Sequence, residues 1–361
     1  MIPMKIKKFI QKIAVIGASV ALFLSSLAPM PARAQASNPP ELLWEKRYDG
    51  GSSDVAYDAA VDNEDNIIIT GESNYDYYTI KYDPSGRQLW VRRYDNDSGY
   101  ADSARGVATD SKNNVIVTGI GGDARNGDTN FFTIKYDSKG NQLWTDDFNK
   151  RGSIWAHDVA VDLRDDSIVV AGYALNYSPT LGRNTDILIV KYDTYGGMKW
   201  YKYYDVGEDK LFGGVAIDSK GNVIVAGVSN DDFITIKFDE NGNELWSRTV
   251  DKGSSEIGFS VSVDSFDNII VVGKTYDPQN YNYYTYLIKY APDGRVIWDR
   301  SDKDAMQNNT LTVTVDSSNN IIVAKGGNFS KYSDYNIVAY DPNGKLLWEK
   351  IYDGGSSDKG I

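Results

Sequence analysis

The chain alternates between short apolar runs and clusters of turn-forming residues over most of its length. The run at residues 66–71 reads Asn-Ile-Ile-Ile-Thr-Gly, and similar runs return at residues 114–119, 222–227 and 268–273. Each is rich in β-branched residues and is bounded by turn residues, so each predicts a β-strand. Three more strands are predicted around every such run. Around the first run they lie at residues 59–62, 78–82 and 89–94.

Two kinds of turn connect these predicted strands. One begins at residues such as Asp110 and reads Asp-Ser-Lys-Asn-Asn, and the other begins at residues such as Asp83 and reads Asp-Pro-Ser-Gly. In both, the aspartate side chain bonds backbone amides, and a later Gly, Asn or Asp adopts the left-handed conformation. Such tight turns join antiparallel strands, because parallel strands need a long crossover. The pattern therefore predicts units of four antiparallel strands.

Seven tryptophans mark the repeat of this unit. Their spacing varies from 46 residues between Trp44 and Trp90 to 56 residues between Trp144 and Trp200. Most of them end the same phrase, which contains a lysine, an aromatic residue, an aspartate and a glycine turn. A unit of this length cannot bury its apolar face alone, so its copies must pack against one another. The seven are Trp44, Trp90, Trp144, Trp200, Trp246, Trp298 and Trp348.

We predict an all-β fold, a β-propeller of six complete four-stranded antiparallel blades with a surplus N-terminal outer strand. A ring of sheets protects the strand edges that isolated sheets would expose. A β-solenoid is the alternative architecture, although its repeats are usually shorter.

The two ends of the repeat array are nearly identical. Residues 42–54 and 346–358 differ only at Arg47 against Ile351. Two hypotheses follow: a six-bladed ring with a redundant terminal strand, or a truncated seven-bladed protein whose seventh blade is incomplete. The stop in mid-phrase modestly favours the second. The predicted segments are a signal peptide at 1–36, a linker at 37–41, the propeller at 42–353 and the start of a truncated further repeat at 354–361.

The phrases Asn-Ile-Ile-Val-x-Gly, Ile-Lys-Tyr-Asp-x-x-Gly and Leu-Trp resemble the bacterial extracellular β-propeller repeat called SBBP, over residues 42–353. This resemblance implies an exported or surface protein without an assigned reaction. The Asp-x-x-Gly-x-x-x-Trp phrase is also similar to the tryptophan-docking motif of quinoprotein dehydrogenases, which has one more residue between Asp and Gly. Many of those enzymes carry vicinal cysteines, which this chain lacks, so we expect no quinone cofactor.

The first 36 residues have the features of a secretory signal. Four lysines precede an apolar stretch at residues 13–27, and small residues follow, so we predict cleavage after Ala36 or Ala34. The apolar stretch is about 15 residues long, short of the roughly 20 that a helix needs to cross a bilayer. We expect a mature protein free of the membrane, which is secreted, extracellular or at the cell surface, or periplasmic in a Gram-negative source.

The mature chain is strongly acidic and has no cysteine. Removing the four leader lysines and Arg33 takes the formal net charge from −12 to −17. Such a surface repels phosphate groups, so neither nucleic acid nor an anionic membrane surface is an expected partner. Without disulfides, stability must come from the apolar core.

Loops of different length emerge on one predicted face of the ring, and uniform tight turns emerge on the other. Variable loops on a uniform scaffold are where binding sites commonly lie. We predict a non-enzymatic binding or interaction module with a protein or polysaccharide partner on the variable-loop face, with merely solvated loops as an equal alternative. The candidate binding residues are aromatic, namely Tyr57, Trp155, Phe259, Tyr75, Tyr177 and Tyr281.

The alternative function is a glycosidase or lyase acting at the mouth of the central channel. Asp58 and Asp158 could supply the paired carboxylates of glycoside hydrolysis, with Arg105 and His157 as further candidates. His157 is the only histidine and lacks the clustered ligands that zinc needs, so a structural role is favoured and no metal site is assigned. The first strands would place six residues around the mouth, namely Tyr57, Arg105, His157, Gly213, Phe259 and Leu311.

Calcium is the one ion that the loops suggest. Residues 62–66 and 95–99 offer oxygen ligands at alternating positions, but neither has a complete calcium loop ending in a bidentate glutamate. Turn capping explains the aspartate of the first, so no cofactor is expected. The recurring lysines are expected to pair with acids in the scaffold, and they are Lys81, Lys135, Lys191, Lys237 and Lys289.

Overall fold

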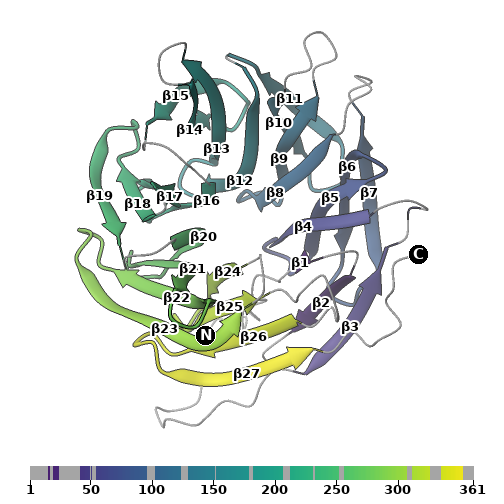
Figure 1. Ribbon diagram of the computed structural model, residues 1–361. Helices are drawn as coiled ribbons and strands as arrows, with labels where there is room; N and C mark the ends of the chain where they lie inside the picture. Colours follow the sequence, from purple (N-terminus) through teal and green to yellow (C-terminus); the bar gives the residue numbers. More distant parts are fainter. Residues whose placement is uncertain are drawn as a thin grey trace, which may run out of the picture.

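The computed structural model of the protein is an all-β ring of sheets around a central axis (Figure 1). Six sheets have four antiparallel strands each, which confirms the predicted propeller and excludes a solenoid. In the part of the chain that the structure describes, no helix is long and apolar enough to cross a membrane. The described residues are 15–16, 19–23, 41–48, 50, 54–95, 102–122, 129–150, 152–178, 182–205, 212–230, 232–251, 256–306, 311–325 and 335–352.

The six blades contain β4 to β27 in consecutive groups of four, ordered from the axis outwards. The first three blades are β4 (Asp54–Val61), β5 (Ile67–Ser73), β6 (Asp76–Tyr82) and β7 (Gln88–Tyr94); β8 (Ser103–Thr109), β9 (Val115–Gly122), β10 (Thr129–Tyr136) and β11 (Gln142–Phe148); and β12 (Ile154–Asp162), β13 (Ser167–Ser178), β14 (Gly182–Tyr192) and β15 (Met198–Tyr204). The last three are β16 (Phe212–Ile217), β17 (Val223–Ser229), β18 (Asp232–Phe238) and β19 (Glu244–Val250); β20 (Glu256–Val263), β21 (Ile269–Asp277), β22 (Asn282–Tyr290) and β23 (Val296–Met306); and β24 (Leu311–Val315), β25 (Ile321–Lys325), β26 (Tyr335–Tyr340) and β27 (Leu346–Tyr352).

A seventh sheet of three strands lies between β27 and β4 in Figure 1. It contains β1 (Val15–Ile16), β2 (Ser19–Phe23) and β3 (Leu42–Arg47), of which β1 and β2 fall inside the predicted signal peptide. β3 pairs with β2, and its Trp44 docks on the first blade as described below. β3 therefore lies outside the six complete blades, which confirms the predicted surplus N-terminal strand. The predicted segment boundaries stay predictions, and residues 354–361 lie outside the described residues.

Outer-strand tryptophans join neighbouring blades at one end of the ring. The Trp90 Nε1 donates to the Ser138 carbonyl, 3.1 Å away, in the turn of the next blade. In the same turn Gly140 has a φ of +85° and lies against the Trp90 ring, where an added Cβ would be only 2.9 Å from it. A glycine is required there because both the φ and the ring exclude a side chain. Equivalent hydrogen bonds link Trp44 to Pro84, Trp144 to Thr194, Trp200 to Glu240, Trp246 to Pro292 and Trp298 to Pro342.

Buried ion pairs strengthen the same end. The Lys135 Nζ lies 2.8 Å from the Asp110 carboxylate of its own blade and also donates to the Thr194 carbonyl, which accepts the Trp144 bond too. The third blade differs, because Arg164 pairs with Asp162 instead of a lysine. The recurring lysines therefore belong to the scaffold. The other buried pairs are Lys81 with Asp62, Lys237 with Asp218 and Lys289 with Asp264.

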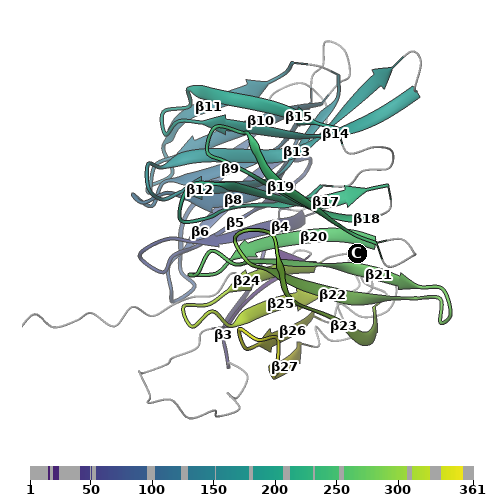
Figure 2. The same cartoon turned by 90° about the vertical axis from the view of Figure 1, so that its left-hand side faces the viewer.

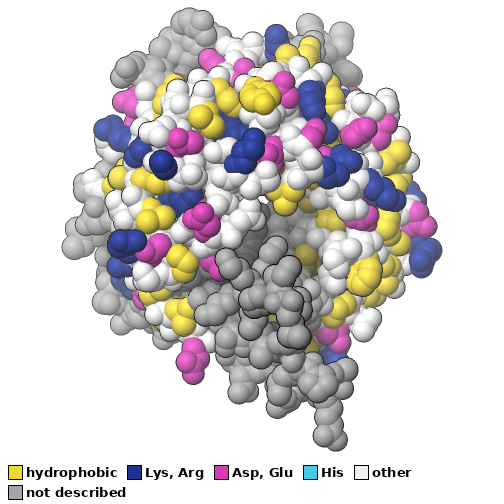
Figure 3. Space-filling model, turned by 180° about the vertical axis from the view of Figure 1, so that it is seen from behind, with side chains coloured by type: hydrophobic (Ala, Val, Ile, Leu, Met, Phe, Trp, Pro, Cys, Tyr) yellow, Lys and Arg dark blue, Asp and Glu magenta, His cyan; other side chains and the backbone are white. Residues whose placement is uncertain are grey.

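The two ends of the ring carry different connections, as the sequence predicted. Tight turns of the Asp62 and Asp83 kind close one end, where charged side chains of both signs are interspersed (Figure 3). The connections from second to third strands emerge at the other end, where the β13–β14 hairpin and the β21–β22 turn project (Figure 2). We call these the turn end and the mouth end.

Candidate functional site

β-Bulges interrupt the innermost strands of five blades near the mouth end. In β4 the register with β5 shifts between Ala56 and Asp58, which leaves Tyr57 outside the ladder. A bulged residue has no partner across the ladder, so the bulge turns its side chain to a new direction. The register shifts at the same place in β8, β12, β16 and β20, and the bulged residues are Tyr57, Arg105, His157, Gly213 and Phe259. These are five of the six residues predicted around the mouth.

The glycine that ends each second-strand motif makes room for the bulge. A Cβ added at Gly71 would lie 1.9 Å from the Val55 carbonyl oxygen, and one at Gly172 would lie 1.9 Å from the Trp155 oxygen. No side chain fits that distance. The sixth blade has Lys325 at the matching position, and there β24 pairs with β25 in an unbroken register from Leu311 onwards. Leu311 is thus paired, unlike the five bulged residues.

In three of the five bulged strands, β4, β12 and β20, the side chain of the residue after the bulge ties the inner strand to the next blade. The Asp58 carboxylate accepts the Val107 amide at 2.9 Å, and the Asp158 carboxylate accepts the Val215 amide at 2.9 Å. Ser260 accepts the Val313 amide at 3.2 Å in the same way. The two aspartates predicted as catalytic carboxylates therefore hold the inner strands together.

Three of the predicted residues form a cluster with two others at the mouth. The Arg105 guanidinium lies over the Tyr57 ring, 3.9 Å from its centre, and the Tyr57 hydroxyl donates to Glu72 at 3.2 Å. The rings of His157 and Tyr173 are 5.0 Å apart. Innermost strands of three successive blades thus supply Tyr57, Arg105 and His157.

A third aromatic ring of the same blade extends the pair of His157 and Tyr173. The Trp155 ring lies 4.8 Å from Tyr173, which places Tyr173 between Trp155 and His157. We define the mouth cluster as Tyr57, Glu72, Arg105, Trp155, His157 and Tyr173. Its side chains are neither fully buried nor fully exposed, which suits contact with a ligand.

Burial and the Arg105 charge set the protonation of this cluster. Burial, reinforced by Arg105, lowers the pKa of His157 to about 4, so its imidazole is neutral at pH 7. Burial raises the pKa of Tyr57, with Arg105 opposing and Glu72 reinforcing the shift. Arg105 therefore supplies the positive charge within the mouth cluster at neutral pH.

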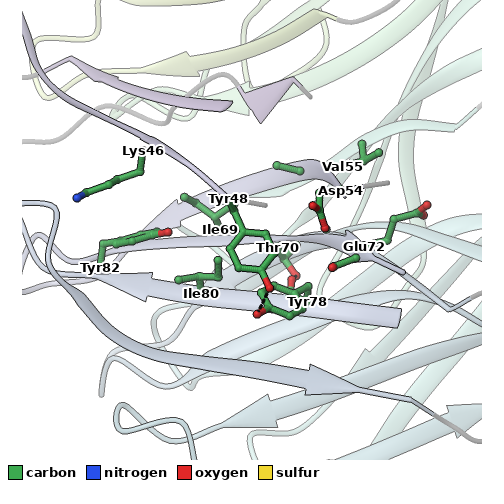
Figure 4. A pocket seen from close by; sticks show the side chains of 13 residues that line it. Lys46, Tyr48, Asp54, Val55, Ile69, Thr70, Glu72, Tyr78, Ile80 and Tyr82 are labelled. Carbon is green, nitrogen blue, oxygen red and sulfur yellow. Dashed lines mark hydrogen bonds between the residues drawn. The ribbon is translucent and has the colours of Figure 1, made fainter. Parts of the chain in front are cut away.

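A cleft between β3 and the first blade adjoins this cluster (Figure 4). Apolar side chains such as Ile69 and Ile80 line its floor. The hydroxyls of Tyr48 and Tyr78 meet across it in a hydrogen bond. Glu72 lies at one end of the cleft and accepts the Tyr57 bond described above, so cleft and mouth cluster are continuous.

The remaining predicted aromatic residues lie apart from the mouth cluster or outside the description. Tyr75 is 62% exposed in the β5–β6 turn, and Tyr281 is 80% exposed in the β21–β22 turn. The side chains of Tyr177 and Phe259 lie outside the described residues, although their strands are placed.

Sequence reasoning missed Glu72 and Tyr173. Each directly follows the glycine of its second-strand motif, Gly71 or Gly172, opposite a bulge. The signal was therefore present in the repeat, because the position after that glycine differs in chemical character from blade to blade, whereas the positions between the first residue of the motif and the glycine hold only β-branched residues or alanine.

Nothing in the described segments forms a group of three or more metal-ligating side chains. In the predicted calcium loop at residues 62–66, the Asp62 carboxylate accepts the amides of Glu64 and Asn66 and pairs with Lys81. This carboxylate serves the turn. In the second predicted loop only Asp95 is described.

Comparisons with known proteins bear on the fold alone. No protein-family model matches the chain, and no curated protein matches its sequence. Among solved structures, the β-propeller domain of Myceliophteria thermophila Cps50 (Swd1) is 8% identical, with a TM-score of 0.53, covering 83% of this chain and 87% of that one. A Bacteroides caccae protein of unknown function is 13% identical, with a TM-score of 0.48 and coverage of 83% and 96%. The likeness to the Cps50 domain agrees with the propeller fold.

Proposed function

We propose that the protein is an exported, non-enzymatic β-propeller with SBBP-type repeats that binds a polysaccharide at the mouth cluster. In this proposal it works outside the cell, at the cell surface or in a periplasm, and it needs no cofactor. The observation that carries the proposal is the row of Trp155, Tyr173 and His157 rings beside the Arg105 and Tyr57 pair.

Partly buried rings next to a few polar groups suit a sugar chain. Aromatic faces cover the apolar face of a sugar ring with little loss of side-chain entropy, while Glu72 and Arg105 offer an acceptor and donors for hydroxyl groups.

The observed bonds weigh against the alternative of a glycosidase or lyase. Such an enzyme needs two carboxylates free to exchange protons or attack the sugar. The Asp58 and Asp158 carboxylates instead accept amides of the next blade, and moving either would break the inner ring.

Glycan binding by the purified protein tests the proposal. A panel of soluble oligosaccharides is titrated by calorimetry, and we expect at least one to bind. The double variant Tyr57→Ala/Trp155→Ala should lose about tenfold or more of that affinity, because each ring contributes about 0.5 kcal/mol or more beyond its buried area. Tyr195→Ala is the matched control, since Tyr195 is 83% exposed in a turn at the other end.

Two outcomes would overturn the proposal. Binding of no glycan, together with capture of a defined protein partner, would assign the face to protein recognition. Release of new reducing or unsaturated ends from a bound glycan would establish the enzyme alternative.

A further inference from the structure

Arg105 has uncommitted donors at the mouth. Its Nε is buried without a hydrogen-bond partner, and none of the ion pairs found among the described residues includes its guanidinium. The guanidinium rests on the Tyr57 ring at 3.9 Å. An arginine carries five N–H donors in a planar fork, so this one retains its capacity for an acceptor.

Two other stacked arginines show what a structural arginine looks like in this protein. Arg92 and Arg248 each lie 5.6 Å from a tryptophan ring at the turn end. The Arg92 Nε donates to the Gly140 carbonyl at 2.6 Å, and the Arg248 Nε donates to the Gly294 carbonyl at 2.9 Å. Arg105 has the stacking contact without the backbone bond, so its placement is not explained by holding a turn.

The carboxylates of Glu72, Asp58 and Asp158, at the same end of the blades as Arg105, accept hydrogen bonds from other groups. Glu72 accepts the Tyr57 hydroxyl, and Asp58 and Asp158 accept amides of the next blade. In a chain with 50 acidic and 38 basic residues, an arginine without a carboxylate partner is unexpected unless something else supplies one.

We infer that Arg105 binds the carboxylate of a uronic-acid unit in the polysaccharide, an inference that rests on the proposed function above. One face of the guanidinium is covered by Tyr57, so a ligand meets its edge, where a planar carboxylate can accept two parallel N–H bonds. Tyr173 and Trp155 then provide a surface for the neighbouring sugar unit. A singly charged carboxylate also meets less repulsion from the acidic chain than a doubly charged phosphate.

Oligogalacturonate and its fully methyl-esterified form test the inference, because they differ only in the carboxylate charge. We expect the purified protein to prefer the acid. Arg105→Gln should reduce affinity for the acid by about tenfold to a hundredfold, since it removes charge-assisted bonds, and should leave the ester unchanged. Arg248→Gln is the matched control and should keep the preference for the acid.

Each other outcome has a distinct meaning. Equal affinity for acid and ester in the unaltered protein would overturn the carboxylate assignment and leave polysaccharide binding intact. Equal binding of a sulfated neutral oligosaccharide would also overturn it, because any anion would then suffice. Failure to bind either form, or any other glycan, would overturn the proposed function together with this inference.

Discussion

The turn end and the mouth end of the ring are built from the same repeats, yet they differ in what varies. At the turn end every complete blade offers an aspartate turn, and five lysines and six tryptophans bond turn carbonyls of the following blade. At the mouth end the bulge position holds a different residue in each of five blades, from Tyr57 to Phe259. The positions that join the blades at the turn end are nearly the same in every blade, whereas the bulge positions differ from blade to blade.

The largest effect is expected where the turn end is most buried. The Asp218 carboxylate accepts the amides of Lys220 and Asn222 and pairs with the Lys237 ammonium at 2.8 Å, and both charged side chains are almost fully buried. Burial disfavours the charged form, yet the bonds from Lys237 and Asn222 outweigh it and lower the pKa of Asp218. Asp218→Ala should cost about 3 to 5 kcal/mol in the free energy of unfolding, because Lys237 is left buried and unpaired.

Urea unfolding of Asp218→Ala measures this, with Asp239→Ala as its control. Asp239 caps an exposed turn through Asn241 and Asn243 and pairs with no lysine among the described residues, so its loss should cost only about 1 kcal/mol. Equal losses of unfolding free energy in the two variants would mean that the buried ion pair adds nothing to the stability of the turn.

The turn end was also the part that the sequence predicted best. Each turn needs an aspartate first and a glycine or asparagine later, and the contact between blades needs a tryptophan against a glycine. These residue requirements recur in the sequence as one repeated phrase, as at Asp83, Gly86 and Trp90. The position of β3 was harder to predict, because the sequence around Trp44 does not show which turn the tryptophan contacts. Only the bond from Trp44 to Pro84 settles that.

A smaller effect is expected at the mouth as the pH falls. Burial lowers the pKa of His157 to about 4, whereas an unfolded histidine has a pKa near 6.5. Between these values the unfolded chain takes up a proton that the folded chain does not, so stability falls as the pH falls through this window. The loss should be on the order of 2 kcal/mol between pH 7 and pH 4.5.

His157→Gln should remove this slope while leaving any steeper loss below pH 4, where carboxylates such as Asp110 and Asp218 protonate in the unfolded chain. Since His157 is the only histidine, its imidazole proton signal gives the folded pKa by NMR without assignment. A measured pKa near 6.5 would show that the mouth is open to water at this position.

The mouth cluster could be predicted only in part. Tyr57, Arg105, Trp155 and His157 were identified because the start of each inner strand was aligned to the turn, and that alignment held. The roles of Asp58 and Asp158 could not be deduced from the sequence. Their carboxylates accept amides of the next blade, and the repeat does not reveal how far apart the inner strands of neighbouring blades lie. Glu72 and Tyr173 became visible only once the bulge placed them opposite Tyr57 and Trp155.

The smallest expected difference separates two arginines that each lie over an aromatic ring. Arg248→Gln removes hydrogen bonds to the Gly294 and Ser247 carbonyls and should cost about 1 to 2 kcal/mol in the free energy of unfolding. Arg105→Gln breaks no hydrogen bond found among the described residues and loses the stack on Tyr57, so its cost should be about 0.5 kcal/mol. Thermal unfolding of both variants without ligand measures the gap. If Arg105→Gln lowered the free energy of unfolding as much as Arg248→Gln, Arg105 would be a scaffold residue like those of the turn end, and its N–H donors would not be available to a ligand.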